Sequence, residues 1–141
     1  MRDKMKIKLV EQAIQMTKQS YAPYSHFHVG AALLGENGKI YTGCNIENAS
    51  YSATVCAERV AVFKAVSEGV TSFTAIAIAG GRNGVITDYC APSGGCRQVL
   101  REFCKEDFEI ILAKSPEECK VYKIYTLGQL LPESFGPEML S

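Results

Sequence analysis

The sequence lacks a surplus of charge of either sign. Fifteen lysines and arginines balance 15 aspartates and glutamates. A nucleic-acid partner is therefore disfavoured, because proteins that bind a phosphate backbone usually carry more basic than acidic residues. The sequence also lacks an apolar run of about 18 residues and a signal-peptide-like stretch after its charged start. These absences predict a soluble, cytoplasmic protein with no membrane contact.

The chain has no internal repeat, linker or low-complexity segment. Its 141 residues, 47% of them hydrophobic and 21% charged, are enough to build one core without a second domain. We therefore predict a single domain over residues 1–141.

The six cysteines contain no Cys-x-x-Cys pair, which disfavours a thiol oxidoreductase. A disulfide framework would need a secreted protein, and nothing here points to secretion. The cysteines are therefore either buried small side chains or metal-binding and catalytic groups. They stand at positions 44, 56, 90, 96, 104 and 119.

Hydrophobic periodicity and turn signals predict four helices and five strands. The helices are expected over residues 4–19, 55–68, 95–105 and 127–131, and the strands over residues 27–34, 40–45, 73–79, 108–113 and 121–125. The second helix is apolar nearly all round, which predicts burial, and Gly80-Gly81 is expected to end the third strand. This order implies a three-layer α/β/α domain around a mixed five-stranded sheet.

Two short segments place a cysteine, Cys56 or Cys96, in the opening turn of a predicted helix. A helix N-terminus favours the thiolate, the form that binds metal. Glu58 can project toward the same pocket and take a proton from a metal-activated water. Arg59 can hydrogen-bond the thiolates and offset their charge. Taken alone, residues 56–58 are more typical of a buried cysteine followed by a solvated charge.

Residues 56–59, followed by Pro92, Gly94 and residues 96–98, resemble the zinc site of the small cytidine deaminases. Residues 21–25, 30–34 and 43–49 also resemble segments of that family, so the resemblance covers about residues 6–135. It implies a Zn²⁺-dependent homotetramer that deaminates a free nucleoside, cytidine or deoxycytidine, in pyrimidine salvage. The products would be uridine or deoxyuridine and ammonia.

The resemblance also implies roles for substrate-binding residues. Asn45 and Glu47 would hydrogen-bond the sugar hydroxyls, and Phe27 would pack on the pyrimidine face. Ala57 would line the base edge through its backbone, and Phe135 would enter a neighbouring subunit's site. Without the family, Asn45 and Glu47 are more typical of a polar pair at a hairpin end, and Phe27 of a core aromatic.

Ser93 departs from the family pattern, which has Pro-Cys-x-x-Cys where this chain has Pro92 followed by Ser93. The resemblance therefore supplies Cys56 and Cys96 as zinc ligands, and Ser93 as a weak or absent third ligand. A serine hydroxyl keeps its proton near neutral pH and is a poor donor to zinc, whereas a metal-bound thiol is deprotonated. Cys90 is a possible substitute thiol, but it is expected on the strand side of Pro92.

Three explanations for Ser93 stay open: an active enzyme with a modified site, an impaired homologue, and a substitution introduced to trap substrate. Two rival functions also stay open. One is nucleoside binding without turnover, and the other is deamination of a nucleic acid or a nucleoside antibiotic. The neutral charge balance and the expected sugar clamp of Asn45 and Glu47 favour a free nucleoside. In the favoured mechanism, an activated water attacks C4 while Glu58 moves protons.

Overall fold

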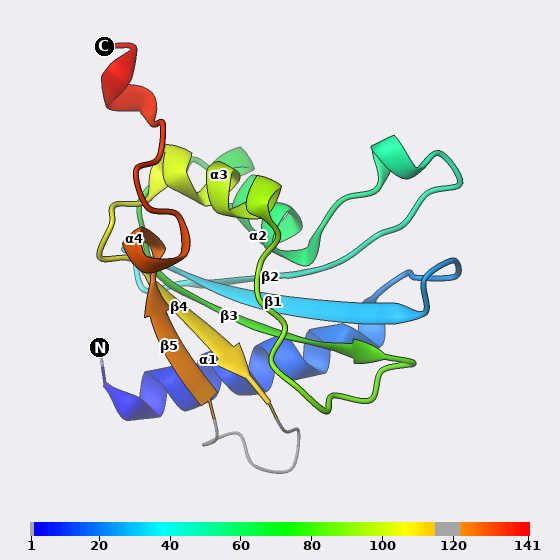
Figure 1. Ribbon diagram of the computed structural model, residues 1–141. Helices are drawn as coiled ribbons and strands as arrows, with labels where there is room; N and C mark the ends of the chain where they lie inside the picture. The colour runs from blue at the N-terminus through cyan, green and yellow to red at the C-terminus, as the bar shows by residue number, and fades with distance from the viewer. Residues whose placement is uncertain (1, 115–121) are drawn as a thin grey trace.

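The computed structural model describes residues 2–114 and 122–141, so Cys119 and Val121 lie outside the described chain (Figure 1). The described residues form nine regular elements. In chain order they are α1 (Asp3–Met16), β1 (Phe27–Gly35), β2 (Ile40–Cys44), α2 (Ala57–Ser67), β3 (Phe73–Arg82), α3 (Gly94–Phe103), β4 (Glu109–Ala113), β5 (Tyr122–Thr126) and α4 (Leu127–Leu130). Short 3-10 turns lie at Thr17–Gln19, Tyr51–Ala53 and Pro137–Met139. The first helix therefore ends earlier than predicted, because its last turn tightens into the first of these turns.

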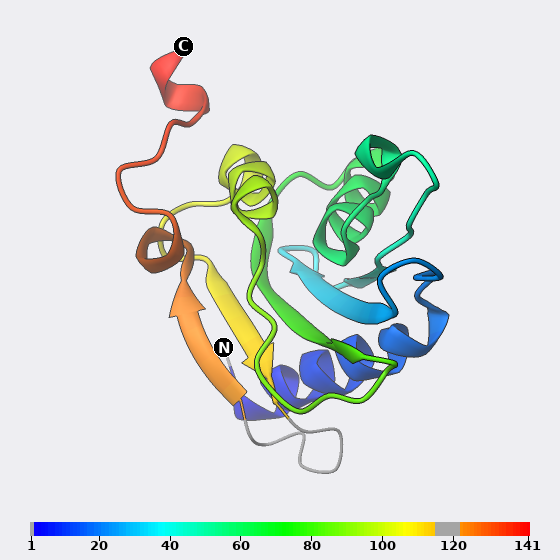
Figure 2. The same cartoon turned by 45° about the vertical axis from the view of Figure 1, so that its right-hand side comes forward.

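The five strands form one mixed sheet in the order β2-β1-β3-β4-β5. β1 runs antiparallel to both β2 and β3, β3 and β4 are parallel, and β5 is antiparallel to β4. Figures 1 and 2 show α1 across one face of the sheet and α2 and α3 across the other. The predicted three-layer architecture is confirmed.

β1 shows why the central strands are apolar on both faces. Ala31 and Leu33 belong to the core under α2 and α3, whereas Ala32 and Leu34 belong to the core over α1. Successive side chains of a strand point to opposite faces, so a strand covered on both sides carries a continuous apolar run. Each fully buried aliphatic side chain contributes about 1.5–3 kcal/mol.

The prediction that Gly80-Gly81 ends β3 is wrong, because β3 continues to Arg82 with Gly80 paired to Val29. Instead, the two glycines allow the chain that follows β3 to pack closely against the strand. A Cβ at Gly81 would overlap the backbone of Val85, and one at Gly80 would lie 3.0 Å from the Cys90 sulfur. The missing side chains therefore let the connection between β3 and α3 pass tightly over the end of the sheet.

α2 is only partly buried within the chain, which corrects the prediction of a wholly buried helix. Its inner face packs on the sheet, but Phe63 is 50% exposed. Gly43 of β2 sets how closely the helix approaches, because a Cβ there would overlap the Ala57 carbonyl oxygen and crowd the Ala61 nitrogen. The first turn of α2 is thereby fixed against the sheet.

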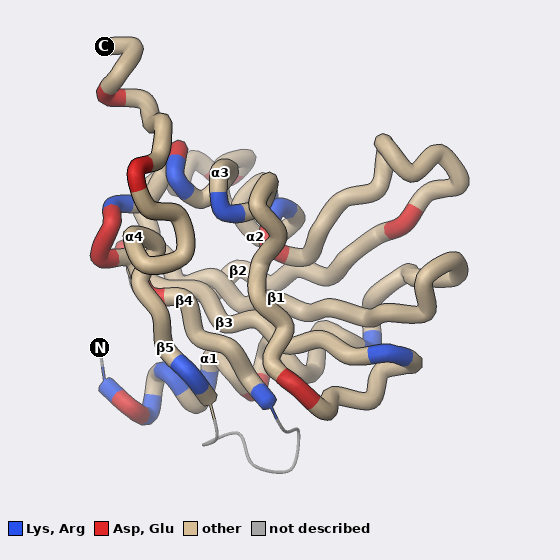
Figure 3. Tube along the Cα trace, viewed as in Figure 1, with Lys and Arg blue, Asp and Glu red and all other residues tan. Residues whose placement is uncertain are grey.

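Acidic and basic residues are interspersed along the chain trace (Figure 3). Within residues 2–114 and 122–141, no helix is long and apolar enough to cross a membrane.

Candidate active site

The N-termini of α2 and α3 meet beside a cavity of about 190 Å³. Cys56 is the N-cap residue of α2, one position before the helix proper, and Cys96 is the third residue of α3. The structure thus brings together residues forty positions apart, as the sequence predicted. The cavity is lined by Val29, Asn45, Thr54, Val55, Cys56, Ala57, Glu58, Cys90, Ala91 and Ser93.

The thiols of Cys56 and Cys96 are joined by a hydrogen bond and so share a proton. Because Cys96 donates to the Cys56 sulfur, the pKa of Cys56 falls to about 7, and nearby Arg59 favours the thiolate further. The pKa of Cys96 is raised by the same bond and by burial. The pair therefore gives up one proton near neutral pH and holds the second firmly.

Ser93 caps α3, because its Oγ accepts a hydrogen bond from the Cys96 backbone nitrogen at 3.4 Å. The same hydroxyl donates to the Cys96 sulfur at 3.2 Å. Ser93 therefore bonds to both the backbone and the sulfur of Cys96 through one hydroxyl. In residues 2–114 and 122–141, no three histidine, cysteine or carboxylate side chains gather into a metal-binding group.

Cys90 lines the same cavity but does not complete the thiol pair. Its sulfur packs near Gly80 and Val29 on the sheet side, as the sequence predicted. Burial is the main cause that raises the pKa of Cys90 to about 11, and the neighbouring Glu58 and Cys96 add to it. Cys90 therefore remains a protonated thiol in the cavity wall.

Glu58 lies in the first turn of α2, where only 4% of it is exposed. Burial is the largest cause that raises its pKa from the ordinary 4.5 to about 8, and the neighbouring Cys96 raises it further. A hydrogen bond joins the Glu58 carboxyl to the Cys96 sulfur. A buried carboxyl that titrates near neutral pH is suited to accept and donate protons.

Arg59 lies near the thiol pair but does not line the cavity. Its guanidinium packs against the backbone of Gly95, where a Cβ would overlap an Arg59 nitrogen. The Nε atom of Arg59 is buried and has no hydrogen-bond partner among the described residues. Its charge acts on the thiols through space and lowers the pKa of Cys56.

Asn45 lines the cavity, but its side chain already bonds within the chain. Its Oδ1 accepts from the Val29 nitrogen at 2.9 Å and from the Ser20 hydroxyl, and its Nδ2 donates to the Phe27 carbonyl at 2.8 Å. Asn45 therefore fixes the start of β1.

Glu47 holds the loop before β1. Its Oε1 accepts from the backbone nitrogens of Tyr24 and Ser25 at 3.0 and 3.1 Å. The side chain of Ser25 also donates to it, and this bond is the largest cause that lowers the pKa of Glu47. Phe27 follows this loop as the first residue of β1, partly exposed and outside the cavity lining.

Phe135 does not reach this cavity. It lies in the C-terminal segment with 56% of its surface exposed. Arg97, which was not predicted to have a role of its own, donates to the Pro92 carbonyl at 2.8 Å and to the Leu130 carbonyl at 2.7 Å. Arg97 thereby ties the loop that carries Ser93 to α4. Its only sequence signal was its place directly after Cys96.

Comparisons with known proteins agree with this arrangement. Residues 3–112 match the family described as the cytidine and deoxycytidylate deaminase zinc-binding region. A cytidine deaminase from Sporosarcina psychrophila is 46% identical over 95% of this chain and 93% of its own length. One from Halalkalibacterium halodurans is 42% identical over 92% of this chain and 93% of its own length. The crystal structure of cytidine deaminase from Burkholderia pseudomallei is 41% identical, with a TM-score of 0.80 over 91% of this chain and 97% of its own.

Proposed function

Because the chain belongs to the cytidine deaminase family, we propose that it hydrolyses the 4-amino group of free cytidine or deoxycytidine, releasing ammonia and uridine or deoxyuridine. The observation that carries this proposal is the buried Glu58 carboxyl, with a pKa of about 8, which lines one cavity together with Cys56 and bonds to the buried Cys96. The reaction belongs to cytoplasmic pyrimidine salvage, carried out by a homotetramer.

Glu58 is the proton carrier of the proposed reaction. In its protonated form the carboxyl gives a proton to N3 of the cytosine ring, which makes C4 electrophilic. As a carboxylate it accepts one proton of the attacking water and passes it to the departing ammonia, and it takes up the proton of the C4 hydroxyl as the C4 carbonyl forms. A pKa near the working pH suits both steps, because neither protonation state is rare.

Cys56 and Cys96 would hold the zinc ion that the family implies, with Ser93 as a weak third partner. The fit is incomplete, since two sulfurs suit zinc but the hydroxyl that bonds to the Cys96 sulfur does not replace a thiolate. Zinc, when bound, supplies a Lewis acid that makes water acidic. With two thiolates in place of three, the site would carry less negative charge for Arg59 to offset.

The remaining site residues would position the nucleoside. Asn45 and Glu47 would hydrogen-bond the sugar hydroxyls, and Phe27 would pack on the base. The internal hydrogen bonds of Asn45 and Glu47 support this role, because a side chain already held in place loses little entropy when it binds a ligand, and the Asn45 amide keeps a second proton to donate. Ala57 lines the base edge, and Phe135 would come from a neighbouring subunit.

Ser93 favours a second candidate, a homologue that binds the nucleoside but turns it over poorly. The hydroxyl's bond to the Cys96 sulfur is the specific observation in its favour. Losing one ligand weakens metal retention, because structural zinc sites draw on the order of 10 kcal/mol from a full ligand set.

The test is ammonia release from cytidine, deoxycytidine and a cytosine-containing single-stranded oligonucleotide, with zinc per chain measured on the same sample. We expect turnover of the nucleosides alone, and its loss in Glu58→Gln. Cytidine binding without zinc and without ammonia would support the impaired homologue. Turnover of the oligonucleotide would refute the free-nucleoside assignment.

A further inference from the structure

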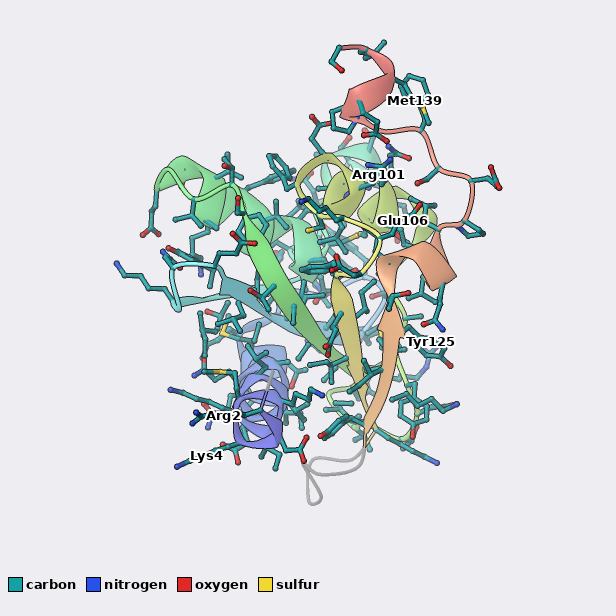
Figure 4. The ribbon with its side chains drawn as sticks, turned by 90° about the vertical axis from the view of Figure 1, so that its left-hand side faces the viewer. Arg2, Lys4, Arg101, Glu106, Tyr125 and Met139 are labelled. Carbon is teal, nitrogen blue, oxygen red and sulfur yellow. The ribbon has the colours of Figure 1, made fainter. Side chains whose placement is uncertain are left out.

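Arg101, near the end of α3, holds the C-terminal segment against the domain. Its Nε donates to the Ser134 hydroxyl at 2.8 Å, and its two terminal nitrogens bond the two carboxylate oxygens of Glu138. Figure 4 shows Arg101 at the junction between α3 and the segment that carries Met139. A guanidinium suits this place because its planar fork can bond a carboxylate and a hydroxyl at once.

Gly136 lies against the same guanidinium. A Cβ at position 136 would overlap Cζ and both terminal nitrogens of Arg101, so the guanidinium packs directly on that backbone. Gln98, one turn earlier on α3, adds a bond from its Nε2 to the Phe135 carbonyl at 2.8 Å. Ser134, Gly136 and Glu138 thus all contact one side chain.

Phe135 is turned outward by this arrangement. The backbone at Gly136 is extended, with φ −141 and ψ 177, and neighbouring residues in extended chain point to opposite sides. Since Ser134 and Gly136 face α3, Phe135 faces away, with 56% of its surface exposed. Met139 and Leu140 are also exposed. In Figures 1 and 2 the end of the chain rises past α3 and away from the sheet.

We propose that Arg101 is a positioning residue for the deamination reaction: it fixes residues 134–138 on α3 so that the Phe135 ring is presented to the cavity of a second copy of this chain. This inference rests on the proposed function, in which Phe135 completes a neighbouring site. The guanidinium of Arg101 thereby determines where the Phe135 ring lies, and it does so from α3, the helix that also carries Cys96.

The test compares KM with kcat in Arg101 variants. We expect Arg101→Met to raise KM for cytidine about tenfold, the change that follows from losing one well-formed charged contact. The expected change in kcat is below about twofold, since Glu58 is untouched. Arg101→Lys should give an intermediate KM, because an ammonium cannot bond Ser134 and both oxygens of Glu138 together.

The matched control is Glu106→Gln. Glu106 acts on Arg101 through space, whereas Glu138 bonds to it directly (Figure 4). Glu138→Gln should therefore raise KM, and Glu106→Gln should leave it within about twofold. The double variant Arg101→Glu with Glu138→Arg should recover part of the loss. A merely structural role for Arg101 would instead lower the melting temperature of Arg101→Met and leave KM unchanged.

Two further measurements separate this inference from the proposed function. Hydrogen exchange of residues 132–141 should accelerate in Arg101→Met whether or not the protein turns over cytidine; unchanged exchange would overturn the inference. Phe135→Ala should raise KM as much as Arg101→Met does. If Phe135→Ala raises KM and Arg101→Met does not, the positioning role is wrong while the proposed function stands. If Phe135→Ala has no effect, the cross-subunit role and this inference fail together.

Discussion

Replacing Glu58 by glutamine should stabilise the metal-free protein at neutral and alkaline pH while abolishing deamination. The folded chain raises the pKa of this carboxyl from 4.5 to about 8, chiefly because the group is buried with 4% of its surface exposed. Folding therefore favours the protonated form. The associated stability is fully present below pH 4.5 and is lost as the pH rises toward 8.

The size of the effect follows from the same two pKa values. At about 1.4 kcal/mol per pKa unit, the difference between 4.5 and about 8 sets an upper bound of roughly 5 kcal/mol on the stability lost by pH 9. Water entry and relaxation around the charge reduce this bound, so we expect about 1–3 kcal/mol. Glutamine has nearly the same shape and does not titrate, so the variant should escape the loss.

Urea unfolding of chelator-treated protein between pH 5 and pH 9, at one protein concentration, measures the difference. The advantage of Glu58→Gln over the original chain should grow steadily with pH. Glu102→Gln, which removes an exposed carboxylate from α3, shows how much of the change comes from net charge alone. If the original chain and Glu58→Gln lose stability in parallel, burial does not raise the Glu58 pKa and its proposed acid–base role loses its physical basis.

Ser93→Cys should raise zinc affinity at least about tenfold in chelator competition, because a third thiolate joins the pair; unchanged affinity would show that position 93 does not face the metal. Gly43→Ala should destabilise the fold by about 1–3 kcal/mol in urea unfolding, because the new methyl group overlaps Ala57 and crowds Ala61 of α2; Gly38→Ala, in the open β1–β2 turn, meets no atom but lies at a positive φ, so its cost measures backbone strain without a clash. In metal-free protein, iodoacetamide labelling of Cys56, followed by mass spectrometry, should be half-maximal near pH 7; labelling that begins only above pH 8 would contradict the shared proton.

Local pattern was enough to predict the order of the elements and the two segments that carry the chemistry. The apolar run in β3 predicted a strand covered on both faces, and two cysteines were expected at helix starts, whereas their meeting at one site was implied only by the family resemblance. These inferences succeed because strand and helix periodicity is a property of neighbouring residues. The departure at Ser93 was also visible in the sequence, since it required only a comparison of residue types.

The tertiary structure alone decided how these residues behave. Glu58 follows Cys56 by two residues, yet its raised pKa comes from burial and from Cys96, 38 residues away in sequence. Gly80, which locally is typical of a strand end, instead makes room for the Cys90 thiol. Likewise, no local pattern joined Arg101 to Glu138. Burial, close packing and interactions between charges depend on residues that are distant in sequence. The sequence by itself therefore determined which chemical groups are present, and only the fold determined their pKa values and their contacts.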